Sequence, residues 1–438
     1  MSTLNEDNLQ RSNEDSLAKW AIDVEQDPYD LPIEELNPAH PDLFAARKAA
    51  RIFTRLREED PVHFHEGNQF GPYWSITKYE DIQFVDRIHE IFSSDILNGG
   101  IRLGGRPIEG EPNPMTHLPM FIMQDPPVHD EQCAVLASKF RPRSLSRLES
   151  LIRERACTIL DSLPIGEEFN WVQSVSVELT GQMLATLFGI PHEDRHLLIH
   201  WSDTVERLGN PDYFDTMEDG FKELWKCHEY FAAVWQDCLK QNEPGDDLIS
   251  MLVHGESTRN MTPNEYLGNI LLLIVGGNDT TRNSISGGVL ALNQFPEEYD
   301  KLMANPGLIP SMVNEIIRFH TPLAHMCRTA MQDIELNGHL IKKWDKVVMW
   351  YASDNRDPDI FEDPDAFRIH RPKIPRHLSF GQGLYVCLGQ RLGEMQLRVI
   401  WEEIMKRFDR IEVVGEPRWV RSSFVQGISD LPVVLHRK

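Results

Sequence analysis

Paired-cysteine motifs of zinc and iron–sulfur sites are missing from this chain. It has 438 residues and only six cysteines, none of them in a Cys-x-x-Cys pair, so the patterns of zinc and iron–sulfur sites are absent. The glycine-rich fingerprint of dinucleotide-binding folds is absent as well. The sequence therefore carries no motif for a redox centre of those classes, and its unpaired cysteines fit a reducing cytoplasm.

Long apolar runs and positive charge are also scarce. The longest apolar run covers residues 270–275, which is far too short to span a bilayer. Residues 1–16 are polar and lack the apolar stretch of a signal peptide or an anchor. The formal net charge is −24, which argues against nucleic acid and anionic membrane surfaces as partners. We expect a soluble, cytoplasmic protein with no stable membrane anchor and no nucleic-acid partner.

No linker, repeat or low-complexity segment divides the chain. We expect a polar N-terminal tail over residues 1–27 and a single domain over residues 28–438. Apolar residues recur at helical spacing in segments 43–58, 144–163, 173–189, 219–240, 262–294, 308–320 and 388–408. Short strands are indicated at 61–76 and 328–350, with a late hairpin near 411–436, and Asn337-Gly338 is a strong hairpin-turn pair. The predicted fold class is mostly α with a smaller β region.

One cysteine stands in a distinctive setting. Cys387 lies in the stretch FGQGLYVCLG, residues 380–389, directly before a segment with helical spacing. A thiolate at a helix N-terminus is stabilised by the free N–H groups there, and it can be the axial ligand of haem iron. The glycines let the backbone approach a flat macrocycle, and Phe380 can shield the sulfur. The alternative is a small buried thiol like the other five cysteines, but the specific pattern favours the ligand.

The stretch resembles the haem-binding signature of the cytochrome P-450 superfamily, Phe-x-x-Gly-x-x-x-Cys-x-Gly. The resemblance extends from about residue 45 to the end and is closest to the soluble bacterial alkane and fatty-acid terminal hydroxylases, on residues 276–292, 321–330 and 347–358. It implies the cytochrome P-450 fold, haem b as cofactor and Cys387 as the metal ligand. The other residues implied to hold the cofactor are His129, Arg328, Phe380, Gly381, Tyr385, Gly389, Gly276 and Gly277.

The predicted helix over 262–294 contains an unusual pair of glycines. Gly276 and Gly277 each cost a helix about 1 kcal/mol relative to alanine, which suggests that the helix passes close to a flat group. Asp279 and Thr280 follow, and the resemblance assigns them the catalytic role of delivering protons for oxygen activation. The alternatives are a Thr280 hydroxyl bonded back to the carbonyl of Gly276 and a solvated or ion-paired Asp279.

A Glu-x-x-Arg pair and a later arginine have a structural role in the resemblance. Glu315 and Arg318 share a face of a predicted helix. On their own they carry little information, because the spacing is common. The resemblance joins them with Arg371 in a buried network that holds the cysteine loop.

Haem carboxylates need cationic or hydrogen-bonding partners. The resemblance points to His129 and Arg328 for them. Two positions depart from the family pattern: Cys133 stands where an arginine is common, and Tyr385 where a histidine is common. A tyrosine can still donate a hydrogen bond, whereas a thiol is a weak donor, so we expect weaker or relocated anchoring.

Substrate contacts are predicted from the same resemblance. All are apolar or lack a side chain, as a hydrocarbon substrate requires, and ordinary core packing is the alternative for each. The candidates are Leu118, Met120, Phe121, Val275, Leu323, Met326, Phe424 and Val425. The first three end a long Pro- and Gly-rich loop over residues 98–119, and loops of that length are commonly functional.

Electrons have to come from partners, because the chain carries no motif for a flavin, nicotinamide or iron–sulfur centre. We expect a ferredoxin and an NAD(P)H-dependent ferredoxin reductase. The resemblance implies docking on the cysteine side of the haem, where two groups of basic residues are candidates. One group is Lys139, Arg141 and Arg143, and the other is Arg391 and Arg398; a solvated charged face is the alternative.

The sequence therefore predicts a haem-thiolate monooxygenase that inserts one atom of O2 into a C–H bond of a hydrophobic small molecule. The expected reaction is terminal hydroxylation of a medium-chain alkane or fatty acid. A rival substrate class is a steroid or terpene. A rival of another kind is a non-catalytic haem sensor or carrier, against which the Asp279-Thr280 pair argues, since gas binding alone needs no proton delivery.

Overall fold

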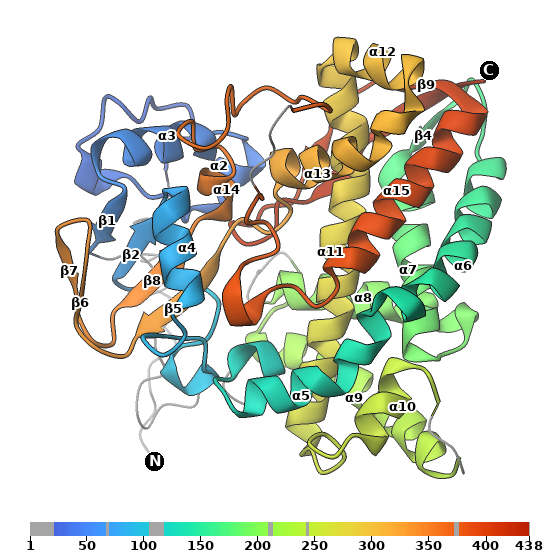
Figure 1. The fold of residues 1–438 in the computed structure, drawn as a ribbon, viewed down its shortest axis with the longest axis horizontal. Helices are drawn as coiled ribbons and strands as arrows, with labels where there is room; N and C mark the ends of the chain where they lie inside the picture. Colours follow the sequence, from blue (N-terminus) through green and yellow to red (C-terminus); the bar gives the residue numbers. More distant parts are fainter. Residues whose placement is uncertain are drawn as a thin grey trace.

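Helices make up most of the protein, and a smaller sheet region lies to one side of them (Figure 1). The structure is a computed structural model that describes residues 22–66, 70–104, 118–208, 213–241, 245–371 and 376–437. The predicted mostly α fold with a smaller β region is confirmed. The α-helices are α2 (Pro41–Ala45), α3 (Ala49–Glu59), α4 (Tyr79–Arg87), α5 (Val128–Ala137), α6 (Pro142–Asp161), α7 (Glu178–Phe188), α8 (Arg195–Arg207), α9 (Met217–Leu239), α10 (Leu248–His254), α11 (Pro263–Gln294), α12 (Pro296–Ala304), α13 (Ile309–His320), α14 (Tyr351–Asp354) and α15 (Gln390–Arg407).

The strands form one larger sheet and three small ones. The larger sheet has the order β1-β2-β8-β5-β3, in which only β2 and β8 run parallel. A three-stranded sheet has the order β4-β12-β9, and two hairpin-like pairs are β6-β7 and β10-β11. The strands are β1 (Val62–His65), β2 (Tyr73–Ile76), β3 (Phe92–Ser93), β4 (Glu168–Asn170), β5 (Met326–Ala330), β6 (Ile334–Leu336), β7 (His339–Ile341), β8 (Lys346–Met349), β9 (Phe408–Val413), β10 (Arg418–Trp419), β11 (Ile428–Asp430) and β12 (Pro432–Arg437).

The larger sheet is buried on both faces, because its central strand is apolar at consecutive positions. In β8, Val347 and Met349 pack with α4, whereas Val348 packs with α3. That alternation follows from the period of two along a strand. The turn between β6 and β7 uses Asn337 and Gly338 with φ of 49° and 79°, so the hairpin predicted from that pair is confirmed.

Helix α11 runs through the middle of the helical part, and α15 crosses it (Figure 1). Helix α11 begins with a capping box, in which the Thr262 side chain accepts from the N–H of Glu265 and the Glu265 side chain accepts from the N–H of Thr262. Most of its length is buried in the largest apolar core. No helix among the described residues is long and apolar enough to cross a membrane.

The N-terminal tail lies mostly outside the described residues, since the first described residue is Ile22. Its last residues are held against α3. Lys48 contacts Glu25 with Nζ 2.9 Å from Oε2, and Arg51 contacts Asp27 with Nη2 2.8 Å from Oδ2. The division into a tail and one domain stays a prediction.

Candidate active site

The cysteine loop ends where α15 begins, as the sequence predicts. Gly381 and Gly383 take φ of 66° and 71°, a left-handed backbone that favours glycine. A side chain at Gly383 would also collide with the backbone oxygen of Asp86, 2.9 Å from an ideal Cβ. The N–H of Cys387 donates to the carbonyl of Phe380 at 2.8 Å, which closes the loop and turns the sulfur inward.

The sulfur of Cys387 is open to a central cavity although protein surrounds it. Burial raises the pKa of this thiol to about 11, and the backbone N–H groups of Gly389 and Gln390 oppose that rise. These N–H groups are the helix N-terminus expected to support an anionic sulfur. The cavity wall opposite the loop is the middle of α11.

The cysteine loop is supported by the Glu315 network, which is confirmed. Arg318 donates to both carboxylate oxygens of Glu315 at 2.9 and 2.8 Å, and Nε of Arg371 lies 3.0 Å from each of them. Arg318 also donates to the carbonyl of Asn355, whose side chain binds the backbone of Leu378 and the hydroxyl of Ser379. The network therefore reaches the chain just before the cysteine loop, so its role is structural.

The two glycines of α11 face different neighbours. A Cβ built on Gly276 would meet nothing within 4 Å, because that side of the helix faces the cavity. A Cβ on Gly277 would lie 2.8 Å from Leu184 of α7. Gly276 thus leaves room beside the helix, whereas Gly277 chiefly permits close helix packing.

Thr280 and Asp279 both line the cavity. Each also makes the local contact that the sequence offered as the alternative to a catalytic role. The hydroxyl of Thr280 donates to the carbonyl of Gly276 at 2.9 Å. Asp279 is fully buried and contacts Arg282 with Oδ1 2.9 Å from Nη2. Ser202 of α8 donates to its other oxygen at 3.0 Å. A hydroxyl in a local bond can exchange partners at little cost, so these contacts are compatible with proton delivery.

A group of three carboxylates surrounds Arg282. Besides Asp279, Arg282 contacts Asp203 at 2.9 Å and Glu206 at 3.3 Å, both on α8. Burial and the charge of Asp279 raise the pKa of Glu206 well above 4.5, and one of its oxygens is buried without a hydrogen-bond partner. Burial also raises the pKa of Asp279, and Arg282 opposes the rise. One arginine cannot neutralise three carboxylates, and the raised pKa of Glu206 favours its protonated form next to Asp279.

The residues expected to hold haem carboxylates gather at one edge of the cavity. His129 and Tyr385 have ring centroids 4.6 Å apart, and the Arg328 guanidinium lies 4.8 Å from the Tyr385 ring. Cys133 lines the same cavity. Arg328 also donates to Asp86 at 2.7 Å, and Asp86 accepts the backbone N–H of Gln382 in the cysteine loop.

The hydroxyl of Tyr385 does not point to the cavity as a free donor. It lies 2.8 Å from Oδ1 of Asp125 and 3.2 Å from the carbonyl of Gln124. A hydroxyl has one proton to donate. Tyr385 lines the cavity, and its hydroxyl proton is directed to these acceptors. A contact of Tyr385 with a haem carboxylate stays a prediction, as do those of Arg328 and His129.

The predicted substrate residues fall into two groups. Those that line the cavity are Met120, Phe121, Val275, Leu323, Met326, Phe424 and Val425. Leu118 lies outside the cavity wall and packs in the main core, because its backbone lies against Gly268 of α11. Leu323 and Val425 pair through an isolated antiparallel bridge, which brings the segment after α13 to the late hairpin. The middle of the 98–119 loop, residues 105–117, lies outside the described residues.

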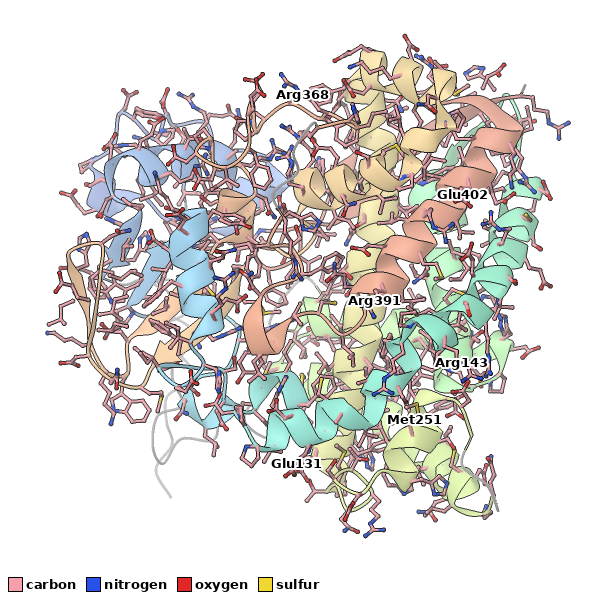
Figure 2. The ribbon with its side chains drawn as sticks, in the orientation of Figure 1. Glu131, Arg143, Met251, Arg368, Arg391 and Glu402 are labelled. Atoms are coloured by element: carbon pink, nitrogen blue, oxygen red, sulfur yellow. The ribbon has the colours of Figure 1, made fainter. Side chains whose placement is uncertain are left out.

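One residue in each of the two basic groups forms ion pairs with neighbouring carboxylates. Arg398 contacts Glu149 and Glu402 at 2.9 and 2.8 Å, and Lys139 contacts Asp246 at 3.3 Å. These two residues are therefore ion-paired, and the docking role of both groups stays a prediction. Four arginines at the starts of α6 and α15 are exposed, and none of them has an ion pair within the described part of the chain. They are Arg141, Arg143, Arg147 and Arg391; Figure 2 labels Arg143 and Arg391.

Several residues of the site were not predicted from the sequence. Arg282 could have been found, since it follows Asp279 by three residues on one helix face. Glu206 and Asp86 carried no signal, because each meets its partner only through packing between distant segments. Arg102, which lines the cavity, likewise carried no signal in the sequence.

The donor set fits a haem. A thiol that opens into the cavity, a helix face without a side chain at Gly276 and polar groups of His129 and Arg328 at one edge match an iron ligand, a flat ring and its carboxylates. The apolar remainder of the cavity wall suits a hydrophobic substrate. When bound there, a haem would supply the oxygen-activating chemistry.

Comparison with known proteins agrees with this geometry. A family model described as Cytochrome P450 matches residues 127–418. Linalool 8-monooxygenase of Pseudomonas putida is 36% identical over 404 residues, which cover 90% of this chain and 98% of that protein. The methyl-branched lipid omega-hydroxylase of Mycobacterium bovis is 32% identical over 421 residues, covering 93% of this chain and 96% of that protein.

A solved structure is similar over nearly the whole chain. Cytochrome P450-153 from Novosphingobium aromaticivorans is 41% identical and superimposes with a TM-score of 0.85. The match covers 91% of this chain and 99% of that one. The similarity therefore includes both the helical part and the sheet region.

Proposed function

This chain belongs to the cytochrome P450 family and is a haem-dependent P450 monooxygenase, and from that premise we propose that it hydroxylates the terminal methyl group of medium-chain alkanes or fatty acids. The family resemblance found in the sequence is confirmed by the match over residues 127–418. The monooxygenase relatives also set aside a purely non-catalytic haem carrier.

One observation carries the substrate proposal: Leu323 and Val425, which pair through an isolated bridge, line the same cavity as Val275 and Gly276. We infer that the two paired side chains narrow the cavity there. A terminal methyl is the least reactive C–H position of a chain, so an enzyme that attacks it must select by geometry. A narrow apolar passage admits an extended chain end first. The name of the relative from Mycobacterium bovis, a lipid omega-hydroxylase, supports the same position of attack.

The functional roles of the site residues follow from this proposal. Cys387 would be the iron ligand, and His129 and Arg328 would bind the haem carboxylates. Thr280 would pass a proton from Asp279 toward the oxygen that is being reduced, with Arg282 and Glu206 holding the charge of Asp279. Water would be excluded by the apolar wall formed by Phe121, Leu323 and their neighbours.

Product analysis tests the proposal. The reconstituted enzyme is supplied with alkanes and fatty acids from octane to dodecane length, and the products are separated by gas chromatography. Primary alcohols or ω-hydroxy acids are expected as main products. Turnover of a terpene or steroid without binding of any alkane or fatty acid would reject this substrate class and leave the monooxygenase assignment intact.

A terpene alcohol is the second candidate substrate. The observation that favours it is the 36% identity to linalool 8-monooxygenase over nearly the full length of both chains. The same assay distinguishes it, since linalool carries a branched chain that would have to pass the Leu323–Val425 narrowing. Linalool is therefore included as a competitor in the product assay.

Electrons for the reaction come from separate redox partners, and we propose a ferredoxin with an NAD(P)H-dependent reductase. A small acidic ferredoxin complements the exposed arginines at the starts of α6 and α15, helices that pack against each other. Arg391 lies only four residues beyond Cys387 in the sequence, so a partner docked there would be close to the iron ligand.

A further inference from the structure

Arg102 is a half-buried cation that lines the cavity among mostly apolar side chains. It follows Ile101, whose carbonyl accepts the N–H of Cys327 in β5 at 2.8 Å, so this segment is fixed to the edge of the larger sheet. The Arg102 guanidinium lies 4.5 Å from the centroid of Phe424. Both residues line the cavity together with Met326 and Val425.

The guanidinium of Arg102 has no hydrogen bond or ion pair within the described part of the chain. Burial lowers the pKa of Arg102, and the charges of Glu206 and Asp279 oppose this from a distance. Those two carboxylates are already in contact with Arg282. A desolvated guanidinium without a partner is costly, and a contact with one aromatic ring offsets only part of that cost.

We propose that Arg102 binds a carboxylate inside the cavity and thereby makes the free fatty acid, rather than the alkane, the preferred substrate. This inference rests on the proposed hydroxylation of chain-like substrates. A planar guanidinium pairs with a carboxylate through two parallel hydrogen bonds, whereas a hydrocarbon would leave it unpaired. Haem also carries carboxylates, so the experiment separates the substrate from the cofactor as the source of that group.

The location of Arg102 favours the substrate as that source. His129 and Arg328 lie at the edge of the cavity that suits the haem carboxylates. Arg102 instead lies over Phe424, and the carboxylates that affect its pKa are those behind Thr280 on α11 and α8. Arg102 therefore lines the cavity beside Phe424, one of the predicted substrate contacts.

An anchored carboxylate also fixes which carbon is attacked. With the acid group held at Arg102, the reacting position is counted from the carboxyl end, so only one chain length brings its methyl to the reactive centre. Longer acids are expected to be hydroxylated below the terminus, at the same distance from the carboxyl group. Alkanes and alcohols lack the anchor and should show no such length dependence.

Binding titrations of the haem-loaded enzyme test the inference. Dodecanoic acid, its methyl ester and 1-dodecanol are titrated while the haem spectrum is followed, in the wild type and in Arg102→Gln, Arg102→Lys and Arg259→Gln. Loss of a charge-assisted pair should weaken dodecanoic acid roughly 10- to 100-fold in Arg102→Gln, with the ester and the alcohol unchanged. Arg102→Lys should be intermediate, because it keeps the charge and loses the two-pronged geometry. Arg259→Gln removes an exposed arginine outside both the cavity lining and the proposed docking surface, and should match the wild type.

The haem-to-protein ratio of each variant is measured in parallel. A wild-type ratio in Arg102→Gln together with selective loss of the acid supports the inference. Equal weakening of all three ligands, or loss of haem from Arg102→Gln, would overturn it and assign the arginine to packing or to the cofactor. If 1-dodecanol is hydroxylated at its terminus and Arg102→Gln binds dodecanoic acid as well as the wild type does, only this inference fails. If none of the three ligands binds, the proposed function fails as well.

Discussion

Arg282 lies one turn beyond Asp279 on α11, with its Nη2 2.9 Å from the buried Oδ1 of that carboxylate. The pair sits directly beside the cavity at Thr280, and α8 adds Asp203 and Glu206 to it. Asp279 is thus neither solvated nor isolated. Its charge depends on a small cluster in which Asp203 and Glu206 are half-buried. If Asp279 delivers protons as proposed, this cluster would link that delivery to the packing of α8 on α11.

The cluster predicts a pH-dependent stability that Glu206→Gln removes. The pKa of Glu206 is raised well above 4.5 by burial and by Asp279, so the folded protein holds a proton that the unfolded chain releases. The resulting stabilisation is fully present below the unfolded pKa of about 4.5 and is lost as pH rises through the higher folded pKa. The free energy of unfolding of Glu206→Gln should therefore fall less steeply over this range, as measured by urea denaturation at several pH values.

Asp203→Asn is the matched control for that experiment, because Asp203 contacts the same arginine at 2.9 Å. It alters the ion pairs of Arg282 and leaves Glu206 in place. The pH-dependent fall in stability should persist in this variant. The same slope in Glu206→Gln as in the wild type would contradict the retained proton.

Thr280→Ala should separate substrate binding from productive oxygen use. The hydroxyl lines the cavity and is held only by the carbonyl of Gly276, so its loss leaves the fold intact. Removal of a positioned proton donor typically costs about 100-fold or more, and the reducing equivalents are then expected to appear as hydrogen peroxide. Product formed per NAD(P)H consumed is the measurement, with Thr281→Ala as the neighbouring control. Full coupling in Thr280→Ala would remove this residue from proton delivery.

Arg391→Glu should slow reduction by the ferredoxin and weaken its dependence on ionic strength. The residue is exposed and without an ion pair among the described residues, and opposite charges at a docking surface chiefly raise the association rate. Stopped-flow reduction across a salt series measures this effect. Equal rates for wild type and Arg391→Glu at all salt concentrations would place the docking surface elsewhere.

Arg398→Glu provides a contrast on the same helix. Arg398 contacts Glu149 and Glu402, so its reversal breaks two ion pairs, each worth about 1 kcal/mol or less, and adds repulsion. Its main effect should be a lower melting temperature. A reduction rate as slow as that of Arg391→Glu, with unchanged stability, would show that Arg398 also takes part in docking.

Leu323→Ala should widen the narrowing of the cavity and raise the share of subterminal products. Leu323 lines the cavity where its segment pairs with Val425, so truncation leaves a wider passage beside Gly276. A shift of the main product from the primary to a secondary alcohol is expected by gas chromatography. Leu340→Ala, at an exposed position in β7, should give wild-type products. An unchanged product ratio in Leu323→Ala would show that this side chain does not control the position of attack.

Tyr385→Phe should leave haem retention near the wild-type level, because the hydroxyl proton is donated toward Asp125 and Gln124. Asp125 keeps the backbone N–H of Ser94 at 2.9 Å, so little is lost around it. Arg328→Leu, by contrast, should release haem faster. Transfer of haem to apomyoglobin measures both rates. Rapid loss from Tyr385→Phe would mean that the hydroxyl binds a haem carboxylate after all.

Local sequence patterns predicted the long elements well. The helical spacing over 262–294 and 388–408 corresponds to α11 and α15, and the Asn337-Gly338 pair corresponds to the β6–β7 turn. Helices α4, α5, α8, α10, α12 and α14 were missed. They are short or carry polar residues on the side that faces their neighbours, such as His129 in α5 and Ser202 in α8, so apolar spacing alone does not reveal them.

The sequence by itself determined the iron-ligand loop, the Asp279-Thr280 pair and the Glu315–Arg318 contact, because each depends on residues a few positions apart. Only the tertiary structure decided which charges are available. Arg398 and Lys139 form ion pairs with carboxylates on other elements, and Arg282 contacts three carboxylates. Arg102 lines the cavity without a carboxylate partner among the described residues. Ion pairing and desolvation depend on distance and burial, and these are set by the packing of segments far apart in the chain.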